Sequence, residues 1–333
     1  LVFMYDTGNR KSYVGEPTVN TAGTTGIANS WNNSGTAAWS SDDTNVSRLF
    51  TNLPVFSMDK LTAGNSHIGI GSTSATVSTE YTYSVYVWIP SSNSVNMAGN
   101  SPYFRPQPAN ASVGSLTYGG SSAWGSWPRD QWVRVSITAT TQATNVTSAY
   151  ISCYLDTAGD KIYFTAPQFE QKGHTTPFVN GTRSATQGLI DRTGTSTIDI
   201  SDVSFDSNAQ MTFDGTDDFI SIPTYTFGNG SWTLNMWVNV SAFANYNLMS
   251  NSSSGPVANV FGAHGSNPKI FYMNYDGAWK DHYGNLTLTT NNWYMLTWVN
   301  YAGASASAGT MKMYVNGIAD SSAFNSYTTN GGP

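Results

Sequence analysis

Runs of alternating apolar and polar residues, separated by turns rich in Gly, Asn, Asp and Ser, recur along the whole chain. A period of two places successive side chains on opposite faces of a β-strand, and runs of this length bounded by turn residues are typical of β-sandwiches. Asn316-Gly317 predicts a two-residue hairpin turn, because both positions of such a turn require positive φ. The pattern predicts an all-β chain with strands at residues 81–89, 131–139, 148–156, 161–170, 209–214, 220–222, 231–240, 269–275, 292–301 and 310–316.

Composition narrows the class of protein. With 333 residues, of which 14% are aromatic, the chain is long enough to form two hydrophobic cores. Only 10% of residues are charged, the net charge is -6, and the 14 Lys and Arg residues are scattered, so we expect no nucleic-acid partner. No run approaches the roughly 18 apolar residues of a membrane span. Cys153 is the single cysteine and lies in an alternating run, which indicates a buried, inert side chain.

Three segments of the second half carry a family resemblance. NAQMTFDGTDDFISI (residues 208–222), WYMLTWVN (293–300) and MKMYVNG (311–317) resemble strands of the laminin-G-like, or concanavalin A-like lectin/glucanase, sandwich. The resemblance implies a two-sheet β-sandwich and makes glycan binding or a role in virion structure the expected function. In that family two further strands follow the hairpin, so we expect the chain to be part of a longer polypeptide.

The first half resembles a different module. YTYSVYV, WVRVSIT and IYFTAPQFEQKGHTTPFVNGTR are similar to strands of the carbohydrate-binding-like jelly rolls of phage tail and fibre proteins, over roughly residues 16–183. The opening LVFMYDTGNRKSY, however, resembles the first strand of the laminin-G-like module, whose continuation appears only at residues 188–207. We therefore predict two sandwich domains with the first nested in a loop of the second. Residues 1–15 would supply the first strand of the laminin-G-like sandwich, 16–183 the inserted jelly roll and 184–333 the remainder.

An enzymatic function is not expected. Retaining glycoside hydrolysis needs two carboxyl groups about 5–5.5 Å apart, which glucanases of the resembled family supply from an E-x-D-x-x-E strand. The chain has three glutamates, Glu16, Glu80 and Glu170, and no such strand. The best remaining cluster is Asp276 with Asp281, close to His282, and turn capping is the favoured interpretation of those two aspartates.

The DGTDD turn is the candidate metal site. Asp214, Asp217 and Asp218 bring carboxylates together, and hard oxygen ligands suit calcium. The turn lacks the spacing and the closing glutamate of an EF-hand loop, and Asp-Gly is also favourable turn chemistry. A structural calcium and a simple turn both remain open at this point; no other cofactor is expected.

Aromatic residues in loops are the candidate glycan-binding residues. Sugar sites combine a flat ring with hydrogen-bonding groups at its rim, and the sequence places such rings beside polar residues in Gly-, Ser- and Pro-containing segments. Packing over the end of a sandwich, or contact with a neighbouring subunit, is the alternative for each. The candidates are Trp124, Trp127, Arg129, Tyr103 and Trp279.

Two strands of the second half are apolar on both faces. Trp237 lies on the face opposite Trp232, and Trp293 shares a face with Met295. Strands of this kind fit the middle of a layered structure or an oligomer contact, and stacking on sugars is the less favoured interpretation.

Together these observations predict a non-enzymatic protein of the virion surface, either a fibre or a capsid-decoration subunit. Its expected location is extracellular, and its expected partners are other virion proteins or copies of itself, with host-surface glycans bound weakly and multivalently for adhesion. The alternatives are a purely structural subunit without a ligand, and a secreted bacterial adhesin or the carbohydrate-binding part of a larger enzyme.

Overall fold

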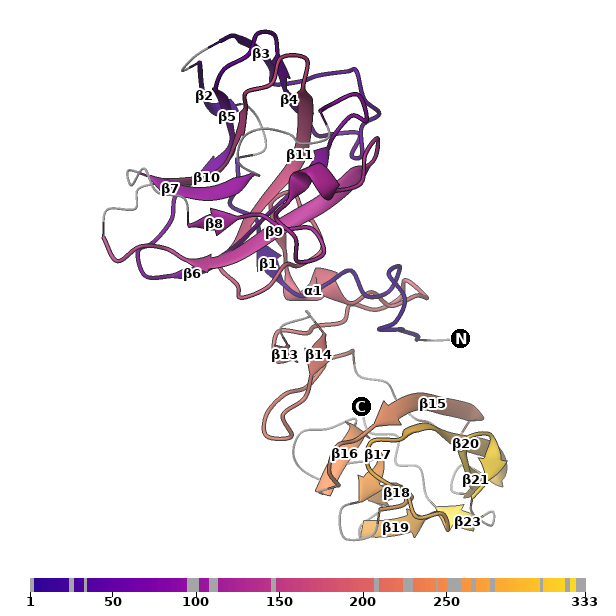
Figure 1. Ribbon diagram of the computed structural model, residues 1–333. Coiled ribbons are helices and arrows are strands. Elements are labelled where there is room, and N and C mark those ends of the chain that lie inside the picture. The colour runs from indigo at the N-terminus through magenta and orange to yellow at the C-terminus, as the bar shows by residue number, and fades with distance from the viewer. Residues whose placement is uncertain are drawn as a thin grey trace. The chain divides into compact units, whose positions relative to one another are not determined.

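The computed structural model is nearly all-β, which confirms the predicted fold class (Figure 1). It describes residues 3–23, 27–32, 35–94, 102–107, 113–144, 148–206, 210–223, 230–243, 245–250, 259–264, 268–275, 279–305, 308–320 and 324–327. Contacts divide the chain into two compact units, Leu1–Ile222 and Pro223–Pro333, each of which is described by itself below.

The first unit contains a jelly roll of two five-stranded antiparallel sheets (Figure 1). One sheet has the order β2-β5-β10-β7-β8, with β2 (Ile27–Asn32), β5 (Ser66–Thr73), β7 (Tyr103–Gln107), β8 (Gly114–Ser115) and β10 (Ser148–Leu155). The other has the order β3-β4-β11-β6-β9, with β3 (Ala37–Ser40), β4 (Phe56–Lys60), β6 (Glu80–Trp88), β9 (Trp132–Thr140) and β11 (Lys161–Glu170). The four strands predicted in this half are β6, β9, β10 and β11, each displaced by at most one residue.

Alternation explains the core between these sheets. In β6 the side chains of Val85 and Val87 are buried between the sheets, while the intervening Tyr86 faces outward and is half-buried. Cys153, on the facing sheet, is fully buried in the same core, and burial raises the pKa of its thiol. A thiol held neutral in an apolar core is inert, as the sequence predicted.

Buried ionic contacts join the two ends of the jelly roll. β1 (Thr18–Val19) pairs with β12 (Thr182–Arg183). Just before β1, the carboxylate of Glu16 is fully buried and forms ion pairs with Lys172 Nζ at 2.6 Å and His174 Nε2 at 2.9 Å. Arg183 Nε donates to the Glu16 carbonyl oxygen at 2.8 Å. Charges buried in this way are retained only when they are paired.

The N-terminal segment pairs with the chain that follows the jelly roll. Tyr13 forms a β-bridge with Leu189, and the Ile190 N–H donates to the Ser12 carbonyl at 2.7 Å. Both segments share a small apolar cluster with the stretch that contains β13 (Ser204–Phe205) and β14 (Met211–Thr212). This cluster is centred on the buried side chains of Leu189, Ile198, Ile200 and Val203.

The pairing of residues 3–15 with the segment after residue 183 is the contact that a nested arrangement requires. The division by contacts falls between Ile222 and Pro223, beyond the predicted boundary at residues 183/184. Assignment of residues 1–15 and 184–222 to the same sandwich as residues 223–333 stays a prediction. Leu1 and Val2 lie outside the described residues.

The described residues of the second unit form two sheets. One has the order β15-β20-β21-β22, with β15 (Trp232–Asn239), β20 (Trp293–Ser305), β21 (Ala308–Val315) and β22 (Ile318–Ala319), and β23 (Phe324–Tyr327) also pairs with β21. The other has the order β16-β17-β18-β19, with β16 (Asn245–Ser250), β17 (Asn259–His264), β18 (Ile270–Tyr275) and β19 (Trp279–Tyr283). The predicted strands at 231–240, 269–275, 292–301 and 310–316 correspond to β15, β18, β20 and β21.

Trp298 occupies the centre of the core of this unit. Its side chain is fully buried among apolar residues of both sheets, at 5.4 Å from the Phe261 ring, and its indole N–H donates to the Phe271 carbonyl at 3.0 Å. The predicted hairpin is confirmed: Asn316 and Gly317 have φ of 52° and 80° between the paired residues Val315 and Ile318.

The predicted strands on either side of the DGTDD turn are shorter than expected. Pairing covers only Met211–Thr212 in β14, and the 220–222 run is reduced to a single bridge between Ser221 and Asp199. A side-chain oxygen supplies the physical reason, because the Asp214 N–H donates to the Asp218 carboxylate at 2.9 Å in place of a ladder partner.

Helical structure is confined to short pieces in the described part of the chain. These are α1 (Ala185–Gly188) and a 3₁₀ turn at Trp124–Ser126. No helix among the described residues has both the length and the hydrophobicity needed to span a membrane.

Candidate functional site

The two loop tryptophans lie in the jelly-roll core. Trp124 begins the 3₁₀ turn and Trp127 follows it, and their side chains are 3% and 2% exposed. The Trp127 indole N–H donates to the Ser121 carbonyl at 2.9 Å, which orients that ring inward. Neither ring offers a face to a sugar. This corrects the glycan-binding expectation for both residues in favour of packing within the sandwich.

Arg129 holds the same loop in place. One guanidinium nitrogen donates to the Gly125 carbonyl at 2.9 Å and the other approaches the Pro90 carbonyl at 3.4 Å. These contacts join the 3₁₀ turn to the end of β6, so the structure gives Arg129 a supporting role in the loop.

Tyr103 lies on the outer face of the β2-β5-β10-β7-β8 sheet, but it is 6% exposed. Its ring stacks on Tyr154 at 5.8 Å, and Arg105 donates to the Tyr154 hydroxyl at 2.8 Å. Burial raises the pKa of Tyr103, and its hydrogen bond with Tyr154 adds to the effect. A ring that is already stacked and covered cannot stack on a sugar, so Tyr103 is also corrected to a packing role.

Trp279 begins β19, and its side chain lies outside the described residues. The same is true of the Asp281 side chain and of Asp276 as a whole. His282 is half-buried, with its ring stacked at 6.3 Å on Tyr272. The candidate role of Trp279 therefore stays a prediction.

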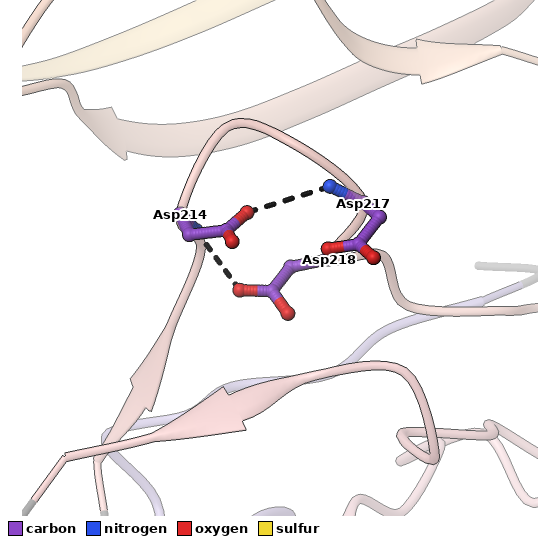
Figure 2. A group of neighbouring side chains, drawn as sticks. All are labelled: Asp214, Asp217 and Asp218. Atoms are coloured by element: carbon purple, nitrogen blue, oxygen red, sulfur yellow. Dashed lines mark hydrogen bonds between the residues drawn. The ribbon is translucent and has the colours of Figure 1, made fainter.

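The three aspartates of the DGTDD turn do come together. One ligand oxygen from each of Asp214, Asp217 and Asp218 lies within 4.8 Å of the others. Figure 2 shows that the Asp218 carboxylate accepts the Asp214 N–H, at 2.9 Å, and that the Asp214 carboxylate faces the Asp217 N–H. The other Asp218 oxygen accepts the Ser204 hydroxyl at 2.9 Å.

Charge and geometry at this turn fit a calcium ion only in part. Within the described chain, no Lys, Arg or His side chain lies in salt-bridge distance of these three carboxylates. Their mutual repulsion is therefore unrelieved by protein cations, which favours a bound cation. Calcium takes 6–8 oxygen ligands, so three carboxylates on an exposed turn would leave several positions to turn carbonyls and water.

The outer face of the β15-β20-β21 sheet is the aromatic surface that loop-based reasoning missed. Trp237 is 62% exposed and Trp293 65%, whereas Trp298, on the inner face of β20, is fully buried. The alternation along each strand gives the reason, since the residues flanking Trp237 in β15 pack against the core. The sequence contained the signal: both strands carry aromatic residues on the face that alternation assigns to solvent.

The first unit has a shallow hollow in the segment between β3 and β4. It has a volume of about 410 Å³ and lies near the end of the jelly roll. Arg48 forms an ion pair with Asp42 at 2.6 Å and donates to the Leu53 carbonyl at 2.7 Å, so the charges at this hollow satisfy each other. It has the size of a small-molecule site but no ring on which a sugar could stack. Its lining residues are Ser41, Asp42, Arg48, Thr51, Asn52, Leu53 and Pro54.

Comparison with known proteins relates the second half to a lectin-like family. Residues 214–333 match the family model of the concanavalin A-like lectin/glucanases superfamily, which accounts for 120 of the 333 residues. This agrees with the resemblance noted for the DGTDD segment and for β20 and β21. No curated protein matches the sequence.

Two solved structures are similar to the chain at low sequence identity. One is the tripod (BppUct-A-L) from the baseplate of bacteriophage Tuc2009, at 10% identity, covering 83% of this chain and 81% of that chain with a TM-score of 0.27. The other is the N-terminal CBM22-1-CBM22-2 tandem domain of Xyn10C from Paenibacillus barcinonensis, at 9% identity, covering 90% of this chain and 89% of that chain with a TM-score of 0.30.

Proposed function

We propose that this chain is a non-enzymatic, glycan-binding adhesion protein exposed on the outside of a virion. The observation that carries the proposal is the match of residues 214–333 to a superfamily of lectins and glucanases. Binding by each copy is weak, and display of many copies converts weak contacts into useful avidity.

The placement of the glutamates supports the non-enzymatic part of the proposal. Glu16 and Glu170 are buried, and their carboxylates are engaged by internal partners, Lys172 for Glu16 and Thr18 for Glu170, each at 2.6 Å. The matched residues 214–333 contain no glutamate. A retaining glucanase pair would require two accessible carboxyl groups facing one substrate.

The virion part of the proposal rests on the likeness of β6, β9 and β11 to jelly rolls of phage tail and fibre proteins. The fibre and capsid-decoration assignments both follow from that resemblance. Immunogold labelling of virions with an antibody against the jelly roll tests it, and label confined to host-cell surfaces would instead favour a bacterial adhesin.

A purely structural subunit is the competing function, and the exposed Trp237 and Trp293 are the observation in its favour. Exposed apolar patches mark protein contacts as well as ligand sites. We also propose a structural calcium ion at Asp214, Asp217 and Asp218, which is compatible with either function.

A glycan array probed with the chain displayed multivalently tests the proposed function. We expect binding to at least one glycan class that survives washing and that soluble glycan of the same class displaces. Silence on the whole array at high avidity would refute glycan-mediated adhesion. The structural alternative would then predict defined oligomers in analytical ultracentrifugation.

A further inference from the structure

The outer face of the β15-β20-β21 sheet has the form of an aromatic platform. We propose that this platform binds an extended, uncharged polysaccharide chain lying along β20, a proposal that rests on glycan binding as the function of the protein. The rings and side chains that would contact the chain are those of Trp237, Trp293, Met295, Val299, Tyr301 and Tyr314.

Strand register places the two tryptophans next to each other. Trp237 pairs with Met295, and Trp293 pairs with Asn239, so Trp237 and Trp293 are diagonal neighbours on one face. Diagonal neighbours are separated by about 7–8 Å, a distance that long aromatic side chains can bridge. The two exposed rings therefore form a continuous apolar surface.

Tyrosines extend the platform along β20 as far as Tyr301. Tyr301 is 44% exposed, and Lys312 Nζ lies 5.6 Å from the centre of its ring. Tyr314 forms a side-chain hydrogen bond with Tyr301, and this bond is the main reason that the pKa of Tyr314 is raised. The interval from Trp293 to Tyr301 is eight residues, or about 27 Å at about 3.4 Å per residue. A platform of this length matches a chain of several sugars rather than one ring.

The polar residues between the rings are neutral. Asn235 donates to Thr297 Oγ1 at 2.7 Å in the middle of the face, and Asn239 and Thr233 are exposed on its β15 edge. Lys312 is the charged side chain on the outer face of β15, β20 and β21 among those the structure describes, and it lies against Tyr301. Amides and hydroxyls bond sugar hydroxyls at the rim of a stacked ring, whereas an acidic polysaccharide would require several cations.

The size of the face favours a narrow ligand over a second copy of the chain. Three strands about 4.8 Å apart and about 27 Å long give an area of about 400 Å². A stable protein interface buries about 800 Å² on each partner, twice this amount. A linear chain one sugar wide needs only the strip along the rings.

Affinity electrophoresis of the full chain in gels containing soluble polysaccharide tests the proposal. The gels contain a neutral β-glucan, a neutral xylan or polygalacturonate, and the variants are Trp237→Ala and Trp293→Ala. Ile318→Ala is the matched control, because Ile318 is 75% exposed in the same sheet but pairs with Val315, which faces the core. Thermal unfolding shows whether each variant remains folded.

We expect a neutral polysaccharide to retard the wild type and Ile318→Ala equally. Each tryptophan variant should bind at least about tenfold more weakly, which corresponds to about 1.4 kcal/mol. Retardation should persist in about 1 M NaCl, where the screening length is about 3 Å and charge attraction is suppressed.

The negative outcomes separate this proposal from the proposed function. Equal retardation of the wild type and both tryptophan variants would overturn the platform and leave glycan binding intact. A preference for polygalacturonate that is abolished by salt would have the same consequence. Silence in every gel and on the glycan array would refute both. A wild-type dimer that either tryptophan substitution dissociates, without binding to any polysaccharide, would identify the face as a contact between copies and overturn the platform.

Discussion

The carboxylate of Asp191 ties the N-terminal segment to the chain that follows the jelly roll. It is 2% exposed and accepts hydrogen bonds from the Met4 N–H at 3.0 Å, from the N–H and hydroxyl of Thr193, and from the N–H of Thr195 and of Ser196. Burial alone would raise the pKa of Asp191, but the bonds from Thr193 and its neighbours outweigh burial and hold the pKa well below its usual value.

Asp191→Asn measures what this anchor contributes to stability. The replacement keeps the shape but places an NH₂ group, a donor, at one of the two oxygen positions. In one orientation the amide faces the N–H groups of Met4 and Thr193, and in the other those of Thr195 and Ser196. Either way two backbone donors lose their acceptor. At about 1–3 kcal/mol for each of the two donors left without a partner, we expect a local loss of about 2–6 kcal/mol.

Hydrogen exchange measured by mass spectrometry reports this loss locally, which matters because the chain has two units and need not unfold in one step. We expect the amides of residues 4–6 and 193–196 to exchange at least about 30-fold faster in Asp191→Asn, the equivalent of about 2 kcal/mol. Asp199→Asn is the control, because Asp199 accepts one side-chain hydrogen bond, from the Ser201 N–H, and Asn retains that acceptor. Unchanged protection of Met4 in Asp191→Asn would refute the role of the carboxylate as an anchor.

Three further predictions follow from single residues. Burial, with a smaller contribution from Arg105, lowers the pKa of His67 to about 4, below its usual value of about 6.5. Its stabilising contribution is therefore complete above pH 6.5 and decreases by about 3 kcal/mol as the pH falls to 4. Urea unfolding at pH 7 and pH 4.5 should show that decrease in the wild type and a smaller one in His67→Gln; equal decreases would contradict it. Calcium at about 10⁻⁴–10⁻³ M should raise the unfolding temperature of the wild type but not of Asp217→Asn, and magnesium serves as the control ion. If calcium has no effect on the wild type, a structural calcium ion at the turn is excluded. Gly317→Ala should lose about 1 kcal/mol in denaturant unfolding because φ is 80° at that position, and an unchanged midpoint would show that the turn relaxes.

Strands could be predicted from the sequence because one physical signal dominates them. In β6 and β15, each inward side chain alternates with an outward one. A period of two in the sequence therefore shows both that the segment is a strand and which of its side chains share a face. The same signal predicted that Trp237 points away from Trp232. Asn316-Gly317 was predictable for a similar reason, because its backbone requirement is local.

Loop tryptophans could not be placed in the same way. Trp124 and Trp127 stand among Gly, Ser and Pro residues, and that local composition is typical of an exposed loop. Their burial depends on how the loop folds back over the core, with Trp127 bonded to the Ser121 carbonyl and Arg129 bonded to Gly125. Tyr103 was misplaced for a related reason, since its partner Tyr154 is distant in the sequence. Contacts of this kind are tertiary and leave no periodic trace.

The exposed strand tryptophans are the more informative result, because their exposure has a cost in the isolated unit. A Trp side chain can bury roughly 150–250 Å², so a ring that is 62% or 65% exposed leaves roughly 100–150 Å² of it in water. At about 25 cal/mol per Å², each of Trp237 and Trp293 forgoes about 3 kcal/mol of burial. The rings of Trp124 and Trp127 have almost no exposed surface left to bury, because folding has already removed them from water. Unburied tryptophan surface that a ligand or partner could cover is therefore available at the strand residues Trp237 and Trp293, and not at Trp124 or Trp127.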